Sequence, residues 1–383
     1  MPRRNVYRTH QSHYSIRKHL CGIGSTENRA FRVSIGVRSN KSYVIKYFEP
    51  HKIIESKKQE TIHSMKVEIE AYETVRHPNI SKFQGYCEDG ILKIENSGET
   101  RISYFVMEDN HGISLFDYIK ETTPFSEFQA RYYFKQLMNV LQHFHKANFI
   151  HRDIKLDNIL IDDAYNLRLI DFGLSCKVDS SKVVTGILGT KGFVAPELFS
   201  CRPVLGPPTD IFSSGVSLLL MIVACQVFTH QDNINEDSDY LTFLKSNQAF
   251  WKKYSRSKKI SKNFKDLINQ MLDPNPSKRI TINEILIHPW MTSESVPSYS
   301  EIVKEFERRR EIIEKKQKAK EKDTIPRFKE EIFGTEIPSK MKEEDLIPDL
   351  FGSFDMEGPL KMISTEGLTI QKKKIFSITK VYE

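Results

Sequence analysis

The sequence lacks a long hydrophobic run. Its longest apolar stretch, residues 216–228, is interrupted by Ser217 and Gln226. This is far shorter than the roughly 20 apolar residues that a membrane-spanning helix needs. We therefore predict a buried core helix here and no membrane span.

Cysteine is also scarce. The 383 residues include five cysteines, and no two of them form a CxxC pair. This pattern excludes a disulfide scaffold and favours reduced thiols in a cytoplasmic or nuclear protein.

Acidic residues are absent from the first 26 positions. The basic residues there are Arg3, Arg4, Arg8, Arg17 and Lys18, which account for most of the formal net charge of +7. A mitochondrial presequence is one interpretation, but strand-like patterning from Tyr14 onward leaves little room for one. We interpret residues 1–13 as a basic leader, and the net charge is weak evidence for nucleic acid binding.

What the chain does contain is material for a core, with 39% hydrophobic, 28% charged and 11% aromatic residues. Runs rich in β-branched and aromatic residues predict strands at 31–37, 43–48 and 102–107, and helical spacing predicts a helix at 60–75. Helices dominate from 115 to 290. The pattern indicates an α+β protein with a small, mainly β lobe at 14–107, a connector at 108–112, and a larger, mainly helical lobe at 113–291.

Residues 292–383 are predicted to be a C-terminal extension, partly helical and partly irregular. A highly charged helix is expected at 301–322, with apolar residues that end at Ile313. It could be an autoinhibitory or calmodulin-binding helix, but the early end of its apolar face favours a solvated, partly docked helix.

The strongest local signal is the segment HRDIKLDNIL at 151–160, followed by Asp171-Phe172-Gly173. These motifs place acids, an amide and a lysine within one loop system. The ordered pair resembles the eukaryotic protein kinase family, over residues 14–291. The resemblance implies a bilobal kinase fold and a single catalytic domain.

It also implies a protein serine/threonine kinase that transfers the γ-phosphate of ATP to protein substrates with the help of Mg²⁺. Asp153 would accept the proton of the substrate hydroxyl. Asn158 and Asp171 would bind Mg²⁺, and Lys155 would neutralise charge on the transferring phosphate. Lys155 and Thr190 are typical of the serine/threonine type.

In the small lobe, the resemblance places Lys46 on the α and β phosphates of ATP. Its partner should be Glu68, nine residues before the His77-Pro78-Asn79 turn. We therefore predict an ion pair between Lys46 and Glu68.

The nucleotide-binding loop and the connector match the family less completely. Gly22 and Gly24 correspond to the first two loop glycines, which let backbone amides approach phosphate, whereas the third glycine is missing. The Glu108 carbonyl and the Asn110 amide would bind adenine beside the gatekeeper Met107. The acid that usually binds ribose is replaced by Ser114.

Further motifs have structural roles in the family. Glu197, which ends Ala195-Pro196-Glu197, should pair with Arg279, and Asp210 should open the helix at 211–228 and accept backbone N–H bonds from the catalytic loop. Four sequence features resemble the calcium/calmodulin-dependent and AMP-activated kinase group: the segment DIFSSGV at 210–216, Phe250-Trp251, the segment KDLI at 265–268 and the ending His288-Pro289-Trp290-Met291.

Arg152 suggests control by phosphorylation, because a guanidinium beside the base can bind a phosphate on the activation segment. Thr185 is the expected site for an upstream activating kinase, and Ser180 and Ser181 are the alternative sites. A basic run at 252–265 could bind nucleic acid, but no accompanying motif supports this, so a solvated loop is favoured.

The competing hypothesis is a pseudokinase that acts as a binding scaffold. The altered glycine loop supports it. The presence of Lys46, Glu68, Asp153, Asn158 and Asp171 favours catalysis.

Overall fold

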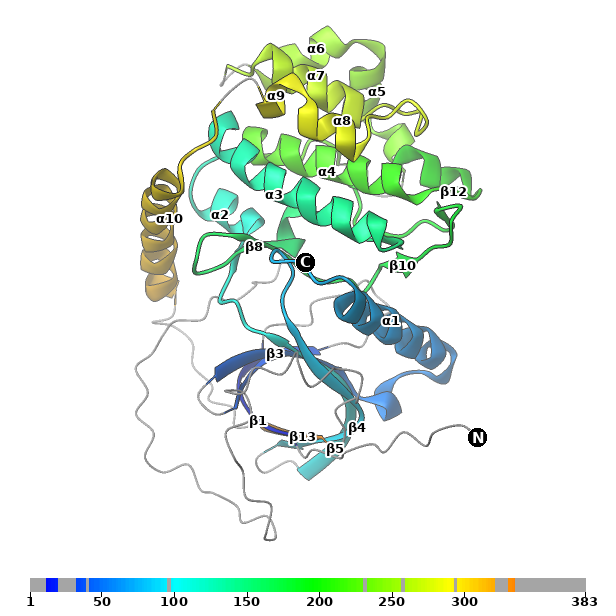
Figure 1. Ribbon diagram of the computed structural model, residues 1–383, viewed down its shortest axis with the longest axis vertical. Coiled ribbons are helices and arrows are strands. Elements are labelled where there is room, and N and C mark those ends of the chain that lie inside the picture. The colour runs from blue at the N-terminus through cyan, green and yellow to red at the C-terminus, as the bar shows by residue number, and fades with distance from the viewer. Residues whose placement is uncertain are drawn as a thin grey trace.

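The computed structural model describes residues 12–19, 32–38, 41–94, 98–229, 233–255, 259–292, 295–320 and 330–334. They form a small lobe of strands with one long helix and a larger lobe of helices, joined by a connector (Figure 1). The predicted α+β bilobal fold is therefore confirmed.

The small lobe is a closed barrel with the strand order β1-β13-β4-β5-β3-β2. Its strands are β1 (Ser12–His19), β2 (Arg32–Arg38), β3 (Lys41–Phe48), β4 (Phe83–Ile94), β5 (Gly98–Glu108) and β13 (Glu330–Gly334). Helix α1 (Glu55–Thr74) lies against it, between the barrel and the large lobe (Figure 1). The strands and the helix predicted from periodicity are all present, with longer bounds for α1 and β5.

Strand β13 is a difference from the predicted organisation, which places the small lobe at 14–107 and the C-terminal extension at 292–383. It pairs antiparallel with β1 on one side and with β4 on the other. A five-residue strand carries little periodicity, and its pairing depends on distant partners rather than on local propensity. The C-terminal extension thus completes the barrel.

The large lobe contains most of the helices. They are α2 (Leu115–Glu121), α3 (Glu127–Lys146), α4 (Gly206–Val223), α5 (Ser238–Lys245), α6 (Asn247–Tyr254), α7 (Lys262–Met271), α8 (Ile282–Ile287) and α9 (Pro289–Thr292). A small sheet has the order β6-β8-β9, from Ile113–Ser114, Ile159–Ile161 and Leu167–Leu169. Two further pairs join β7 (Phe149–Ile150) to β10 (Cys176–Lys177) and β11 (Val183–Val184) to β12 (Val204–Leu205).

Helix α4 differs from the predicted helix at 211–228. It begins earlier because prolines occupy its first turn, where a missing N–H costs nothing. It ends at Val223, because the next residue, Ala224, adopts the left-handed conformation with φ 53°. Asp210 therefore lies inside the helix rather than at its start. By length and composition α4 could cross a membrane, but 83% of it is buried inside the protein, as expected for a core helix.

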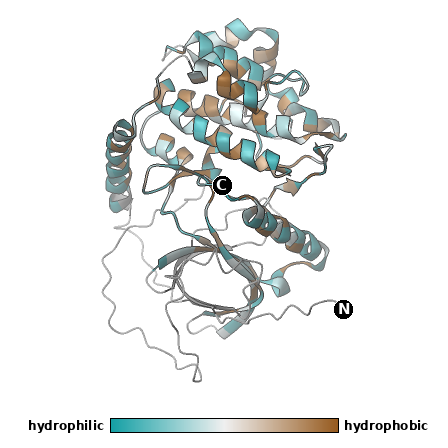
Figure 2. Ribbon diagram, viewed as in Figure 1, coloured by the Kyte–Doolittle hydropathy of each residue, from teal (hydrophilic) through white to brown (hydrophobic). Residues whose placement is uncertain are grey.

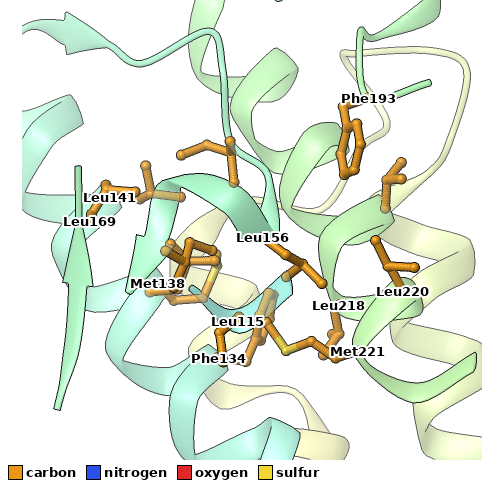
Figure 3. Close-up of a cluster of buried hydrophobic side chains, with 14 of the residues drawn as sticks. Leu115, Phe134, Met138, Leu141, Leu156, Leu169, Phe193, Leu218, Leu220 and Met221 are labelled. Carbon is orange, nitrogen blue, oxygen red and sulfur yellow. The ribbon is translucent and has the colours of Figure 1, made fainter. Parts of the chain in front are cut away.

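The core of the large lobe is continuous and apolar. Apolar colour gathers on the large-lobe helices in Figure 2, whereas the surface of α10 (Tyr299–Lys320) is mostly polar. Figure 3 draws Leu156 of the catalytic loop within this core, together with Leu115 of α2 and Leu218 and Met221 of α4. Burial of Leu156 anchors the loop that carries Asp153 and Asn158.

Helix α10 begins at Tyr299 rather than at the predicted residue 301, and it is described to Lys320. The start follows from a cap: the Ser298 hydroxyl accepts the N–H of Glu301, whose carboxylate in turn accepts the N–H of Ser298. As predicted, the helix is partly docked: Ile302, Phe306 and Ile313 are buried against the large lobe, whereas residues such as Glu307, Glu311 and Lys315 are exposed.

Candidate active site between the lobes

The predicted ion pair between Lys46 and Glu68 is present. Lys46 lies on β3, and its Nζ donates to Glu68 Oε2 at 2.7 Å and Oε1 at 3.0 Å, and to Asp171 Oδ1 at 2.8 Å. Glu68 comes from the middle of α1 and is fully buried. One ammonium group thus joins the small lobe, α1 and the segment after β9.

The charges of this cluster stabilise each other. Burial disfavours the charged form of Lys46, but the nearby carboxylates of Asp171 and Glu68 have the larger effect and raise the pKa of Lys46 to about 12. Burial likewise opposes ionisation of Asp171, yet Lys46, Lys155 and the Gly173 N–H hold the pKa of its carboxyl well below its usual range. Both groups therefore stay ionised at neutral pH.

A second cluster surrounds the Asp153 carboxylate. Asp153 Oδ1 accepts the Thr190 hydroxyl at 2.6 Å, and Oδ2 accepts Asn158 Nδ2 at 2.9 Å. Lys155 Nζ lies 3.3 Å from Asp153 Oδ2 and donates to Thr190 Oγ1 at 2.7 Å. The three predicted catalytic residues therefore meet, and a hydroxyl group already lies among them.

Asn158 and Asp171 form a donor set that suits Mg²⁺. Both hydrogens of the Asn158 amide are used by the Asp153 backbone carbonyl and carboxylate, so its amide oxygen is the atom left for a cation. Within the part of the chain that the structure describes, no three His, Cys, Asp or Glu side chains form a metal cluster. Mg²⁺ is commonly bound by one or two protein oxygens together with substrate phosphates.

Two residues of the site have strained backbones. Arg152 has φ 65° and Asp171 has φ 61°, a region that non-glycine residues seldom occupy. Asp210 supports the first of them, because its carboxylate accepts the N–H groups of His151 at 2.9 Å and Arg152 at 2.8 Å. The predicted role of Asp210 is thus observed, and strain held by such contacts is typical of functional sites.

The predicted nucleotide contacts are only partly described. Gly22 and Gly24 lie outside the described residues. Glu108 ends β5, and Asn110 follows it in the connector, where the Asn110 side chain donates to Ser81 Oγ at 2.7 Å. Ser114 caps α2 by accepting the N–H of Asp117, which explains why a serine suits this position.

Two contacts at the site had no sequence prediction. The Ser64 hydroxyl of α1 donates to the Gly173 carbonyl at 2.6 Å. The buried Phe172 ring lies 4.5 Å, between centroids, from Tyr72 of α1. These contacts fix α1 against the Asp171-Phe172-Gly173 segment. The one sequence signal for them is spacing, because Ser64 and Tyr72 lie four residues before and after Glu68 and so share its face of α1.

This geometry matches what comparison with known proteins finds. The protein kinase domain family matches residues 22–291. The chain belongs to the protein kinase family. The serine/threonine type and the calcium/calmodulin-dependent kinase group, both predicted from motifs, are confirmed by its relatives.

Three relatives illustrate the likeness. A probable serine/threonine-protein kinase, MARK-C, of Dictyostelium discoideum is 28% identical over 342 residues, 88% of this chain and 39% of that protein. CBL-interacting protein kinase 31 of Oryza sativa subsp. japonica is 30% identical over 272 residues, 70% of this chain and 56% of that protein. Serine/threonine-protein kinase cds1 of Schizosaccharomyces pombe is 30% identical over 294 residues, 75% of this chain and 60% of that protein. The chain thus spans between about two fifths and three fifths of these relatives' length.

The kinase domain is braced in the large lobe by the predicted pair of Glu197 and Arg279. Arg279 Nη1 and Nη2 donate to the two carboxylate oxygens at 2.6 and 2.9 Å. The arginine side chain is fully buried and the glutamate is 8% exposed. This pair fixes the end of the activation segment to the loop before α8.

A small pocket opens beside Asp153 under the activation segment. Its apolar lining comes from Leu188, Phe193, Val194 and Leu198. Thr190, Asp153 and Arg152 also line the pocket, so its apolar side chains lie beside the Asp153 carboxylate.

Proposed function

We propose that this kinase domain transfers the γ-phosphate of ATP to serine or threonine hydroxyls of protein substrates. One observation carries the proposal. The Thr190 hydroxyl donates to Asp153 and accepts from Lys155, which is the arrangement that a substrate hydroxyl needs before transfer. A substrate serine or threonine can replace Thr190 between these two charged groups.

Each residue then has a chemical task. Asp153 orients the attacking hydroxyl and takes its proton. Lys155 stays positively charged, because Asp153, Asp157 and Asp171 outweigh its burial and raise its pKa, so it can stabilise negative charge on the transferring group. Lys46 can bind the α and β phosphates, and Mg²⁺ held by Asp171 and Asn158 would neutralise charge between the β and γ phosphates.

The test is transfer of radiolabelled phosphate from ATP to a mixture of protein substrates. We expect the Asp153→Asn variant, which is nearly isosteric, to lose about 10²-fold to 10⁴-fold in rate. Asp89→Asn, an exposed aspartate on β4, is the matched control and should behave as wild type. Wild-type transfer no greater than that of Asp153→Asn would refute the proposal and favour the pseudokinase scaffold.

The pocket beside Asp153 suggests a preference among substrates. An apolar residue next to the target hydroxyl can contact Leu188, Phe193 and Val194 at this pocket, which favours binding through removal of apolar surface from water. A positional peptide library should therefore show enrichment of apolar residues adjacent to the phosphorylated residue. Equal use of charged residues there would contradict this preference.

We also propose that an upstream kinase modifies Thr185. Thr185 is exposed and follows β11 in the activation segment. Arg152, whose guanidinium donates to the Leu174 and Ser175 carbonyls of the same segment, is the cation that we expect a phosphate on Thr185 to recruit. Thr185→Ala should block activation by phosphorylation. Equal turnover of this variant and the fully phosphorylated wild type would contradict the proposal.

Calmodulin binding would require α10 to leave the large lobe. Its apolar residues Ile302, Phe306 and Ile313 are buried there, and calmodulin binds the apolar face of a helix. The structure therefore favours an α10 that remains docked. A pull-down with and without calcium tests this, because calcium-dependent capture of the full chain would show that the helix undocks.

For the compartment, we infer a reducing environment, cytoplasmic or nuclear. Four cysteines within the described ranges, Cys87, Cys176, Cys201 and Cys225, carry free thiols, as is usual in such compartments. Imaging of a tagged full chain tests this inference, and a secreted product would contradict it.

A further inference from the structure

The docking of α10 on the large lobe reaches toward the catalytic loop. The helix lies beside α2 (Figure 1). The Phe306 ring contacts Tyr118, Phe125 and Tyr133 edge-on, with centroids 4.9, 5.5 and 5.0 Å apart. The interface is therefore an aromatic cluster in the core rather than a loose surface contact.

Two consecutive arginines extend this interface to polar groups. Arg309 is 1% exposed, and its Nη1 donates to the Thr122 hydroxyl and the Thr123 carbonyl, both at 2.7 Å. These contacts hold the turn that follows α2. Arg310 points to a different part of the lobe.

Arg310 joins α2 to the turn between β8 and β9. Its Nε donates to the Tyr118 hydroxyl at 3.0 Å, and its Nη1 and Nη2 donate to the Asp163 carboxylate and the Asp162 carbonyl, both at 2.6 Å. The guanidinium also lies over the Tyr165 ring, 4.9 Å from its centroid. A planar group with several donors suits this bridge, whereas lysine would not reproduce it.

The β8–β9 hairpin carries both magnesium-binding candidates at its other end. Asn158 directly precedes β8, and Asp171 follows the end of β9 by two residues. The Ile170 N–H donates to the Asn158 carbonyl at 3.0 Å, which ties the two ends together. Asp162 follows Asn158 by four residues across β8, so the turn held by Arg310 lies about 13 Å along the strand from this ligand.

Resting on the proposed kinase function, we propose that Arg310 is a positioning residue for the reaction. Through its bridge between α2 and the β8–β9 turn, it holds Asn158 and Asp171 at the separation that Mg²⁺ and the nucleotide phosphates need. Helix α10 then contributes to catalysis through the position of Asn158 and Asp171. Loss of the Arg310 bridge should make these two residues more mobile, while the aromatic cluster around Phe306 keeps the helix docked.

The test compares Arg310→Met with Arg308→Met in the full chain. Arg308 is two residues away, half exposed, and pairs with Glu305 on the same helix, so it is a matched control. We expect Arg310→Met to need about threefold to tenfold more Mg²⁺ for half-maximal MgADP binding by calorimetry and to show faster amide exchange at 158–171. Arg308→Met should match wild type in both measurements.

Tyr118→Phe provides a second, milder variant, because it removes only the hydroxyl that Arg310 contacts and keeps the buried ring. It should shift Mg²⁺ dependence in the same direction by a smaller factor. The inference is overturned if Arg310→Met lowers only the melting temperature, with wild-type Mg²⁺ dependence and amide exchange. A wild type that binds MgADP but transfers no phosphate would refute the proposed function alone, and the exchange measurement would still decide the role of Arg310.

Discussion

Replacing Glu197 by Gln should lower the free energy of unfolding of this kinase domain more than the loss of an exposed ion pair does. The Arg279 guanidinium is fully buried, so loss of the opposing charge leaves an uncompensated cation in the core. Breaking one side of a buried ion pair costs about 3–5 kcal/mol. We expect a loss near 3 kcal/mol, because the glutamine carbonyl can still accept one hydrogen bond.

Removing both charges should not restore the wild-type stability. Arg279 also donates to the carbonyls of Pro208 and Asp273. In Glu197→Gln/Arg279→Met these acceptors lose their donor, at about 1–3 kcal/mol for each buried group left unsatisfied. The double variant should therefore remain less stable than wild type, although the two single losses will not add.

Urea unfolding followed by tryptophan fluorescence measures these differences. The only two tryptophans of the chain, Trp251 and Trp290, are buried in the same lobe as the ion pair. Glu311→Gln is the control, because its pair with Lys315 is exposed on α10 and should contribute no more than about 1 kcal/mol. If Glu197→Gln lies within about 1 kcal/mol of wild type, our reasoning about the buried charge is refuted.

Three further predictions follow from the site and the extension. Asp171→Asn should lower the phosphate transfer rate at least about 10²-fold, because it removes the carboxylate that we propose binds Mg²⁺; an unchanged circular dichroism spectrum would show that the variant is folded. The folded protein raises the Lys46 pKa to about 12, so the charged Lys46 contributes fully to stability below about pH 10.4, and this contribution is lost as the pH rises toward 12. The unfolding free energy of wild type should therefore fall over this pH range by more than that of Lys46→Met. Phe306→Ala should destabilise the protein by about 3–5 kcal/mol through the cavity it opens, whereas a melting temperature equal to wild type would show that α10 is not part of the core.

Much of the active site could be predicted from residues alone. The catalytic-loop motif, Asp171 and the spacing from Lys46 to Glu68 placed the main charged groups correctly, because kinase chemistry requires these residue types in this order. Strands with alternating patterns were also predictable, since burial of one face leaves a period of two. Gly22 and Gly24 remain predictions, as do the catalytic and metal-binding roles.

The order of residues along the chain defines which acids, lysines and amides are available for chemistry, and which segments can become strands or helices. Three contacts are visible only in the folded protein: Thr190 with Asp153, β13 with the barrel of the small lobe, and Arg310 with the β8–β9 turn. Each of these depends on residues far apart in the chain whose meeting is decided by the packing of whole elements. Local propensity and periodicity carry no information about such partners, so the role of the extension became visible only in the folded protein.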